Sequence, residues 1–332
     1  SAQDDKGGFG SVVQTAEHSR TRHSNPHYDA HLKHMDGIFN IDKALGMTSH
    51  DVVARVRRIT RQRKAGHAGT LDPMATGVLP VVLGKATRLV EYLADADKAY
   101  RAVVMLGATS DTYDREGTLT PTPGALMPSR EQVEAALGRF RGEIEQVPPM
   151  HSAIKVGGKK LYELARAGVE VERQARRVTI KTLDLEAFNP PTLQIFVECS
   201  KGTYIRSLAY DLGTVLGTGA YLQDLTRTRH GPFSIEGAIT LEGLDAAMQQ
   251  DTWREALYPP EYILRGWHTH TATVEEELAI RQGKTLSLPA PVVGEREMLA
   301  AKTATGALLA VLYWDGERGV WQPKKVFAGG VS

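Results

Sequence analysis

One aspartate stands in a stretch whose residue types and spacing suit a catalytic carboxylate. Asp72 lies in the glycine-rich segment from Gly66 to Pro80, and Pro73 follows it directly. Glycine and proline at this density disfavour a regular helix or a central strand, so we expect a structured loop with Asp72 in an extended conformation. A carboxylate on a stiff loop can act as a nucleophile or a proton acceptor. Taken alone, the segment also fits an ordinary Asp-Pro turn.

Positive charge is concentrated just before this loop. From Arg55 to His67 the chain has no acidic residue and six basic ones, which are Arg55, Arg57, Arg58, Arg61, Arg63 and Lys64. The net charge of the whole chain is only +1. A polyanion responds to charge within a Debye length of roughly 10 Å, so the local concentration is what points to a nucleic acid. Without the loop beside it, the run would fit a solvated helix face better.

Composition places the chain among ordinary globular proteins. Its 332 residues are 42% hydrophobic and 24% charged, enough for one large and one small domain. The single cysteine, Cys199, rules out an internal disulfide and a thiolate zinc cluster. No apolar run approaches the roughly 18 residues of a membrane span, and we see no leader peptide. We therefore expect a cytoplasmic protein with no membrane segment. The sequence of the expected fold region contains no cluster of His, Cys and Asp at the spacing of metal ligands, which disfavours a metal-dependent enzyme.

Hydrophobic periodicity and capping residues predict the elements that hold the loop. Thr48 with Asp51 resembles a capping box before a helix that buries valines and exposes arginines. Ser129 with Gln132 resembles a second one, with Gly142 as the stop of its helix. Strands are expected at 100–106, 178–188, 193–199 and 308–314, and further helices at 205–216 and 241–250. This mixture predicts the α+β class.

Three regions follow from changes in composition. Residues 1–34 are rich in Ser, His and Gly without a sustained period, so we expect a disordered extension or a tag remnant. Residues 35–262 carry the mixed pattern of a main domain. After the break at Pro259-Pro260, residues 263–330 show short strands separated by glycines, which indicates a small β-rich domain.

Five collinear segments make the sequence similar to one known family. Gly66 to Pro80 resembles the signature of the TruB family of pseudouridine synthases, which is close to G-H-T-G-T-L-D-P-x-A-T-G-x-L-P. The other matching segments follow in the family's order and begin at Asp97, Leu106, Pro148 and Ser200. Together they cover roughly residues 36–245. Several motifs in one order argue against a chance Asp-Pro turn.

The resemblance implies a fold and an activity. The fold would be that of the pseudouridine synthases, a mixed and largely antiparallel central sheet flanked by helices and loops. An insert at about 120–175 would contact tRNA, and residues 263–330 would form a PUA-like RNA-binding domain. The implied reaction is isomerisation of the uridine at position 55 in the tRNA T-loop, by base flipping and without a cofactor. The implied partner is tRNA, through its T-arm and acceptor stem, bound by a monomer.

The resemblance also assigns roles to residues. Asp72 would be the essential aspartate and Arg206 the guanidinium that keeps it ionised. Tyr100 would stack on the uracil and serve proton transfer at C5. His67 would occupy the space that the flipped base leaves. Substrate or RNA contact is further implied for Tyr204, Lys43, Asp111, Lys155, Lys160, Tyr162, Leu225, Arg227, Arg63 and Lys64.

Simpler interpretations of these residues stand beside the functional ones. Arg206 also fits a surface arginine at a helix start, and Tyr100 and Tyr204 fit core tyrosines. Asp111 fits a carboxylate that only supports a loop, and Lys43 a structural residue. The sequence departs from the family pattern at three positions, which are Ala44 for proline, Ala68 for threonine and His151 for an aromatic residue.

Two other function classes compete with the synthase. A non-catalytic tRNA-binding or folding protein on the same scaffold would be favoured by the loss of Asp72 or Tyr100, and both are present. A glycoside or nucleoside hydrolase needs a second carboxylate about 5–10 Å from the first. The Asp72 loop contains no second acid. For the synthase itself, attack at ribose C1′, addition to uracil C6 and loss of the C2′ proton stay open as chemical routes.

Overall fold

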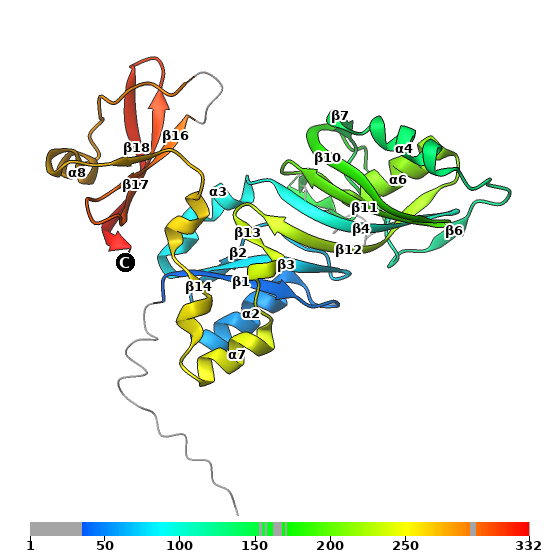
Figure 1. The fold of residues 1–332 in the computed structure, drawn as a ribbon, viewed down its shortest axis with the longest axis horizontal. Coiled ribbons are helices and arrows are strands. Elements are labelled where there is room, and N and C mark those ends of the chain that lie inside the picture. Colours follow the sequence, from blue (N-terminus) through cyan, green and yellow to red (C-terminus); the bar gives the residue numbers. More distant parts are fainter. Residues whose placement is uncertain are drawn as a thin grey trace, which may run out of the picture.

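The structure is a computed structural model that describes residues 35–152, 155–156, 158–161, 168–169, 171–292 and 297–331. Figure 1 shows a large twisted sheet with helices packed on it and a second, smaller sheet to one side. The extension expected at 1–34, the predicted contact residue Tyr162 and parts of the insert expected at about 120–175 lie outside the described residues.

The large sheet has ten strands in the described part of the chain, and eight follow the path β14-β1-β3-β12-β4-β11-β10-β7. β2 adds to β3, and β13 adds to β12. All the pairings are antiparallel except that of β3 with β12, which is parallel. This confirms the mixed, largely antiparallel sheet that the sequence predicts. The strands are β1 (Gly37–Lys43), β2 (Ala65–His67), β3 (Ala75–Leu83), β4 (Lys98–Leu106), β7 (Gly142–Gln146), β10 (Arg176–Asn189), β11 (Thr192–Cys199), β12 (Ala220–His230), β13 (Phe233–Ser234) and β14 (Leu257–Tyr258).

Alternation of side chains explains the inner strands. In β11 the residues Leu193, Ile195, Val197 and Cys199 are fully buried, while Gln194 between them is exposed. Successive side chains of a strand point to opposite faces, so this period of two gives the strand one face in the core. The predicted strands at 100–106, 178–188 and 193–199 all lie within observed strands.

Both predicted capping boxes are present. Thr48 caps α2 (Ser49–Thr60), and Ser129 caps α4 (Arg130–Gly138). The prediction that Gly142 stops the second helix is wrong, because α4 ends at Gly138 and Gly142 begins β7. The other α-helices are α3 (Val90–Ala94), α6 (Ile205–Leu216), α7 (Leu241–Gln249) and α8 (Val274–Arg281), and the short 3-10 helices are η1 (Gly84–Leu89), η2 (Ile235–Gly237), η3 (Trp253–Ala256) and η4 (Pro260–Leu264).

Strand β3 corrects the expectation that the whole segment from Gly66 to Pro80 is a loop. Only the part between β2 and β3 is a loop, and from Ala75 onward the chain forms a buried strand with neighbours on both edges. Gly77 makes this possible, since its φ is +94° and a Cβ there would lie 2.3 Å from the carbonyl oxygen of Arg227. A glycine at this position therefore permits a close approach of two backbones instead of breaking the strand.

The first strand of the sheet is completed by a distant part of the chain. β1 pairs along one edge with β3, which follows it closely in sequence. Its other edge is covered by β14, with Ile38 opposite Tyr258. Buried side chains of β1 such as Phe39 and Ile41 belong to the main core, which α2 and α7 also enter through Val56 and Leu244.

The C-terminal part forms a four-stranded sheet of its own, in the order β15-β16-β17-β18. It joins the main body through a shared apolar cluster that includes Leu89 and Phe327. At this junction Arg88 donates to the carbonyl of Val326, and Lys325 forms an ion pair with Glu91 at 2.8 Å. Its strands are β15 (Thr269–Thr271), β16 (Met298–Lys302), β17 (Leu308–Asp315) and β18 (Val320–Val331).

Two hairpins stand apart from these sheets. They are formed by β5 (Ala108–Ser110) with β6 (Leu119–Pro121), and by β8 (Lys155–Val156) with β9 (Lys159–Lys160). Among the described residues, no helix has the length and apolar character that a bilayer crossing requires.

Candidate active site

The loop that carries Asp72 is tied down on both sides of the aspartate. The side chain of Ser49, at the start of α2, accepts from the N–H of Leu71 at 2.9 Å and donates to its carbonyl at 3.1 Å. The carbonyl of Pro73 accepts from the N–H of Gly46 at 2.8 Å. Leu71 and Met74 are buried on either side. Asp72 is thus held on a rigid loop, as predicted, with its side chain still 37% exposed.

Lys43 adds a third tie to this loop. Its buried ammonium donates to the carbonyls of Ala44, Met47 and Pro73, at 3.0, 2.6 and 3.3 Å. Burial lowers the pKa of Lys43 to about 8, and the negative charge of Asp72 opposes that shift. All three donors of the ammonium are engaged by backbone carbonyls. This geometry matches the interpretation of Lys43 as a structural residue.

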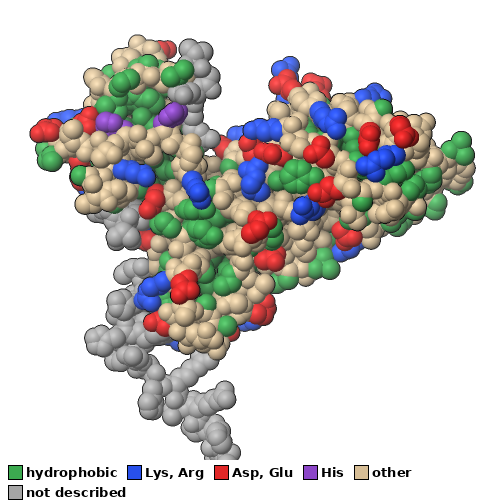
Figure 2. Space-filling model, in the orientation of Figure 1, with side chains coloured by type: hydrophobic (Ala, Val, Ile, Leu, Met, Phe, Trp, Pro, Cys, Tyr) green, Lys and Arg blue, Asp and Glu red, His purple; other side chains and the backbone are tan. Residues whose placement is uncertain are grey.

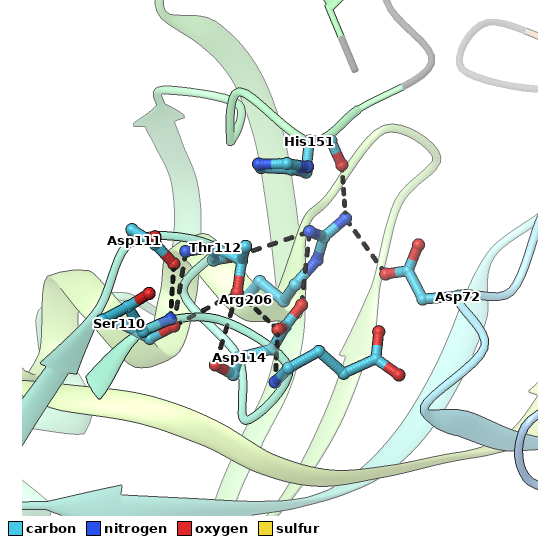
Figure 3. A network of polar contacts seen from close by, with 9 residues as sticks. Asp72, Ser110, Asp111, Thr112, Asp114, His151 and Arg206 are labelled. Atoms are coloured by element: carbon cyan, nitrogen blue, oxygen red, sulfur yellow. Dashed lines mark hydrogen bonds and ion pairs between the residues drawn. The ribbon is translucent and has the colours of Figure 1, made fainter. Parts of the chain in front are cut away.

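Asp72 forms an ion pair with Arg206, although 134 positions separate them in sequence. Arg206 Nη2 lies 3.0 Å from Asp72 Oδ2, and the arginine side chain is only 6% exposed. Figure 3 shows Asp72 on one side of the guanidinium and Asp114 on the other. Burial on one side of the pair and exposure on the other leaves the carboxylate as the part that a substrate can reach.

Asp114 is the second acid on Arg206, and sequence reasoning did not single it out. Its Oδ2 lies 3.4 Å from Arg206 Nη1, and its side chain is 4% exposed. Its other oxygen accepts from the Thr112 hydroxyl at 2.6 Å. Arg206 also donates to the carbonyl of His151 at 2.8 Å. The buried guanidinium is therefore fixed by groups from three segments, which fixes its direction toward Asp72.

Asp111 lies at the hairpin of β5 and β6. Its exposed carboxylate accepts from the N–H of Thr118 at 2.9 Å and so closes the hairpin of β5 and β6. The simpler reading, a carboxylate that supports a loop, matches this contact. Burial raises the pKa of nearby Glu116, and the negative charges of Asp114 and Asp72 raise it further by smaller amounts. The structure thus brings further acids close to Asp72 from a separate loop, which a search of the Asp72 loop alone could not find.

Tyr100 lies in β4 with its side chain almost fully buried. Burial raises the pKa of its phenol to about 12, and the nearby Arg227 guanidinium opposes that shift. Leu225, on the neighbouring strand β12, is also buried. The phenol therefore stays protonated at neutral pH. It can accept a proton from a substrate only if it gives up its own proton in the same step.

Arg227 does not take the expected position. We expected it to contact phosphate, but its side chain is 1% exposed and donates to the carbonyls of Val78 at 2.7 Å and Gly69 at 3.1 Å. An arginine inside the sheet cannot reach a phosphate on the surface. The expectation failed because sequence gives the basic character of a residue in a strand but not the face on which it lies.

Two aromatic groups lie near the loop. The ring of His67 meets His50 edge to face at 5.3 Å between centroids, and burial lowers the pKa of His67 to about 4. His67 is therefore a neutral, flat ring at physiological pH. Tyr204 caps the start of α6, where its N–H donates to Gln146 Oε1 at 2.8 Å, and burial raises the pKa of its phenol.

The basic run is exposed, as predicted. All six of its cationic residues lie at the surface, on α2 and on the turn that leads to β2. Lys155 of β8 is paired with Lys160 of β9 in the backbone register of their hairpin. On the face shown in Figure 2, the described Lys and Arg side chains are interspersed with Asp and Glu over the main body. That face therefore offers no single basic patch among its described residues.

The comparisons with known proteins give the class of this fold and site. A family model described as the N-terminal domain of TruB family pseudouridylate synthase matches residues 57–205, and one described as the C-terminal domain of tRNA pseudouridylate synthase B matches residues 206–265. The class is that of the pseudouridylate synthases. The chain shares 43% identity with tRNA pseudouridine synthase B of Dehalococcoides mccartyi over 293 residues, covering 88% of this chain and 97% of that protein. The chain belongs to the TruB family.

Further relatives agree. The tRNA pseudouridine synthase B of Symbiobacterium thermophilum is 54% identical over 233 residues, which cover 69% of this chain and 76% of that protein. Among solved structures, a Cbf5-Nop10-Gar1 complex contains a chain that matches with a TM-score of 0.71 and 29% identity, covering 91% of this chain and 87% of that one. An H/ACA RNP bound to a substrate RNA containing 2′-deoxyuridine matches with a TM-score of 0.68 and 28% identity, covering 88% and 85%.

Proposed function

We propose that the protein converts uridine to pseudouridine at position 55 in the T-loop of tRNA, with Asp72 as the catalytic carboxylate. The observation that carries the proposal is the ion pair of a half-exposed Asp72 with a buried, fixed Arg206. The guanidinium, with Nη2 at 3.0 Å from Asp72 Oδ2, fixes the direction of the carboxylate and places a positive charge beside it. Family membership supports the same reaction, because the curated relatives bear the name of a tRNA pseudouridine synthase.

The reaction is an isomerisation whose atoms balance without a co-reactant. The bond between uracil N1 and ribose C1′ breaks, and a bond between C5 and C1′ forms. C5 loses its proton and N1 gains one. An ionised oxygen of Asp72 can attack C1′, add to C6 or take the C2′ proton, and each route requires it to be unprotonated and well placed. Arg206 places this oxygen, since Asp114 and the His151 carbonyl hold the guanidinium in position.

The uridine has to leave its stack before Asp72 can reach it. We assign Tyr100 to the flipped uracil, where a phenol can stack and exchange the C5 proton. His67 is assigned to the space that the base leaves, because a neutral ring can stack there without bringing a charge into the RNA. Its low pKa keeps it neutral at physiological pH.

RNA affinity is assigned to phosphate contacts from the exposed basic run, including Arg63 and Lys64, and from Lys155 and Lys160 of the insert. The T-arm would lie along these residues. The C-terminal sheet, as a PUA-like domain over 263–330, would contact the acceptor stem. A monomer suffices, because the chain itself supplies each proposed site residue. A reducing compartment such as the cytoplasm suits its one buried thiol, Cys199.

Mapping pseudouridine in an unmodified T-arm transcript tests the proposal. We expect conversion by the native protein in a buffer with a chelator and without nucleotide or redox cofactor. Asp72→Asn should abolish turnover while tRNA affinity changes by less than about threefold, since affinity rests on phosphate contacts. Asp184→Asn, the same change on an exposed part of β10, is the control and should stay active. Tight tRNA binding by a native protein that converts no uridine would instead indicate a non-catalytic binding protein.

A further inference from the structure

Arg227 is a buried cation that the proposed reaction leaves without a role. Its side chain is 1% exposed and lies in β12, at the middle of the large sheet. Among the described residues no carboxylate forms an ion pair with it, and carbonyls of Val78 and Gly69 accept two of its N–H groups. Placing a guanidinium in a core without a counter-ion is unfavourable unless its donors are satisfied. A surface arginine would avoid this penalty, so its position calls for an explanation.

The position of Arg227 links three parts of the candidate site. On one edge of β12 it stands opposite Tyr100 of β4, and on the other edge opposite Gly77 of β3. Its Nη2 donates to Gly69, in the loop that leads to Asp72. Residues directly opposite each other on antiparallel strands carry their side chains on the same face, so the guanidinium lies beside the Tyr100 phenol. It opposes the rise in the pKa of Tyr100 that burial causes. The phenol thus lies next to a cation that two carbonyls hold in a fixed orientation.

The chemistry of the two groups limits how they can interact. Arginine can only donate hydrogen bonds, so the phenol cannot donate to Arg227, and the hydroxyl hydrogen of Tyr100 has to point to another acceptor. A positive charge beside the oxygen also favours any negative charge that develops on it during proton transfer.

We propose that Arg227 is a positioning residue for isomerisation, which orients the Tyr100 hydroxyl and stabilises negative charge on its oxygen. The proposal rests on the proposed function, because it gives Arg227 a role through Tyr100. It replaces the phosphate contact that the sequence suggested. Arg227 itself touches neither the RNA nor the uracil.

The surroundings favour arginine over lysine at this position. Two backbone carbonyls accept from the side chain, and the phenol of Tyr100 lies beside it. A guanidinium has five donors in one plane and can serve both carbonyls while another donor faces the phenol, whereas an ammonium has its three donors on one atom. Lys98 and His230 lie close to the same turn, since a Cβ on Gly69 would come within 3.5 Å of Lys98 and 3.0 Å of His230. Neither Lys98 nor His230 has a carboxylate that could form an ion pair with a cation at position 227.

The test measures single-turnover conversion of a full tRNA transcript together with the Kd for that tRNA. Arg227→Gln should slow conversion by at least about tenfold, because general acid–base assistance contributes on the order of 10²–10⁴. Its Kd should change by less than about threefold, since no phosphate contact is lost. Arg227→Lys should recover part of the rate. Arg229→Gln, two positions along the same strand and paired with Glu198 at 2.6 Å, is the matched control and should keep the native rate.

A double-mutant cycle separates positioning from a merely structural effect. In a Tyr100→Phe background, followed over hours, Arg227→Gln should slow the residual rate by no more than about threefold, because the oxygen on which it acts is absent. Equal losses in both backgrounds would overturn the proposal, and so would a native rate in Arg227→Gln. A large rise in Kd with a shallower salt dependence would point back to a phosphate contact. Should Arg227→Gln not fold, Arg227→Lys carries the same cycle.

The two proposals fail in different ways. If the native protein converts no T-loop uridine, the proposed function is wrong. The double-mutant cycle then has no native rate with which the variants could be compared. If the native protein is active and Asp72→Asn is not, while Arg227→Gln and Arg229→Gln behave alike, only the role of Arg227 is wrong. Melting temperatures of all the variants show whether each one is folded at the assay temperature.

Discussion

At the scale of single residues, the candidate site is a carboxylate on a stiff loop held against a buried guanidinium. Resemblance to a family pointed to Asp72 and Arg206, and the structure brings them to 3.0 Å. Asp114 belongs to the matching segment that begins at Leu106, but it was given no role because nothing in the sequence tells that its side chain turns inward to the same arginine. Arg227 was misplaced for the converse reason, since its basic side chain suggested a phosphate contact at the surface and the structure buries it. Chemistry can be read from residue types, but the face on which a side chain lies requires the fold.

His67 gives a pH dependence whose sign follows from its burial. The pKa of its ring is lowered from 6.5 to about 4, so the unfolded chain takes up this proton at a higher pH than the folded protein. The folded state therefore loses stability as pH falls from above 6.5 toward 4, and no effect of this group is expected at higher pH. We expect the fall in melting temperature between pH 7 and pH 5 to be smaller in His67→Gln than in the native protein. An identical fall in both would contradict the burial of an uncharged ring at this position.

At the scale of elements, hydrophobic periodicity and capping residues predict the helices and strands better than the positions of glycine and proline predict the loops. Thr48 and Ser129 start helices as expected, because a capping box is a local arrangement of neighbouring residues. The alternation in β11 is likewise visible in sequence. The rule that glycine and proline exclude a central strand failed for β3, where Gly77 allows β12 to come close. A contact between residues 150 positions apart leaves no local mark in the sequence.

Gly77 offers a test of that close approach. Alanine at this position would have to adopt a φ of +94° and would place its Cβ 2.3 Å from the Arg227 carbonyl oxygen. We expect Gly77→Ala to lower the free energy of unfolding by about 1–3 kcal/mol, the range for strained backbone. Gly66→Ala is the matched control, because the nearest atom to its Cβ is 4.0 Å away. Urea unfolding of both variants would reveal the difference, and equal stabilities would show that the two strands can separate freely.

At the scale of the whole molecule, positive and negative charges nearly cancel, but their distribution over the chain is uneven. A net charge of +1 hides an exposed basic run on α2 and the turn after it. The run ends at Lys64, whose carbonyl accepts from the N–H of Gly84 just after β3, whereas Asp72 lies just before the start of that strand. RNA held by the run would therefore have to extend along β3 to reach the carboxylate. The C-terminal sheet is anchored to the same body through Arg88, Lys325 and Phe327, so both RNA-contacting regions proposed here belong to one packed unit.

Neutralising part of the basic run should separate affinity from chemistry. We expect the triple change of Arg55, Arg58 and Lys64 to glutamine to weaken tRNA binding and to make the slope of log Kd against log salt shallower by about 2–3. The rate at saturating tRNA should stay near the native value, because none of the three touches the Asp72 loop. Changing Arg130, Arg139 and Arg177 to glutamine removes the same charge elsewhere on the surface. A similar loss of slope in that control would show that net charge, and not the run, attracts the RNA.

The pairing of β1 with β14 has a consequence for how the protein is made. Ile38 leaves the ribosome about 220 residues before its partner Tyr258, which at 5–20 residues per second is a delay on the order of 10–45 s. Throughout that interval the backbone groups of Ile38 and Phe39 on this edge of β1 lack their partners in β14. An unsatisfied strand edge readily adds a foreign chain. Newly synthesised copies are therefore expected to be most prone to aggregation before translation reaches β14, and slowing elongation should lengthen that vulnerable period.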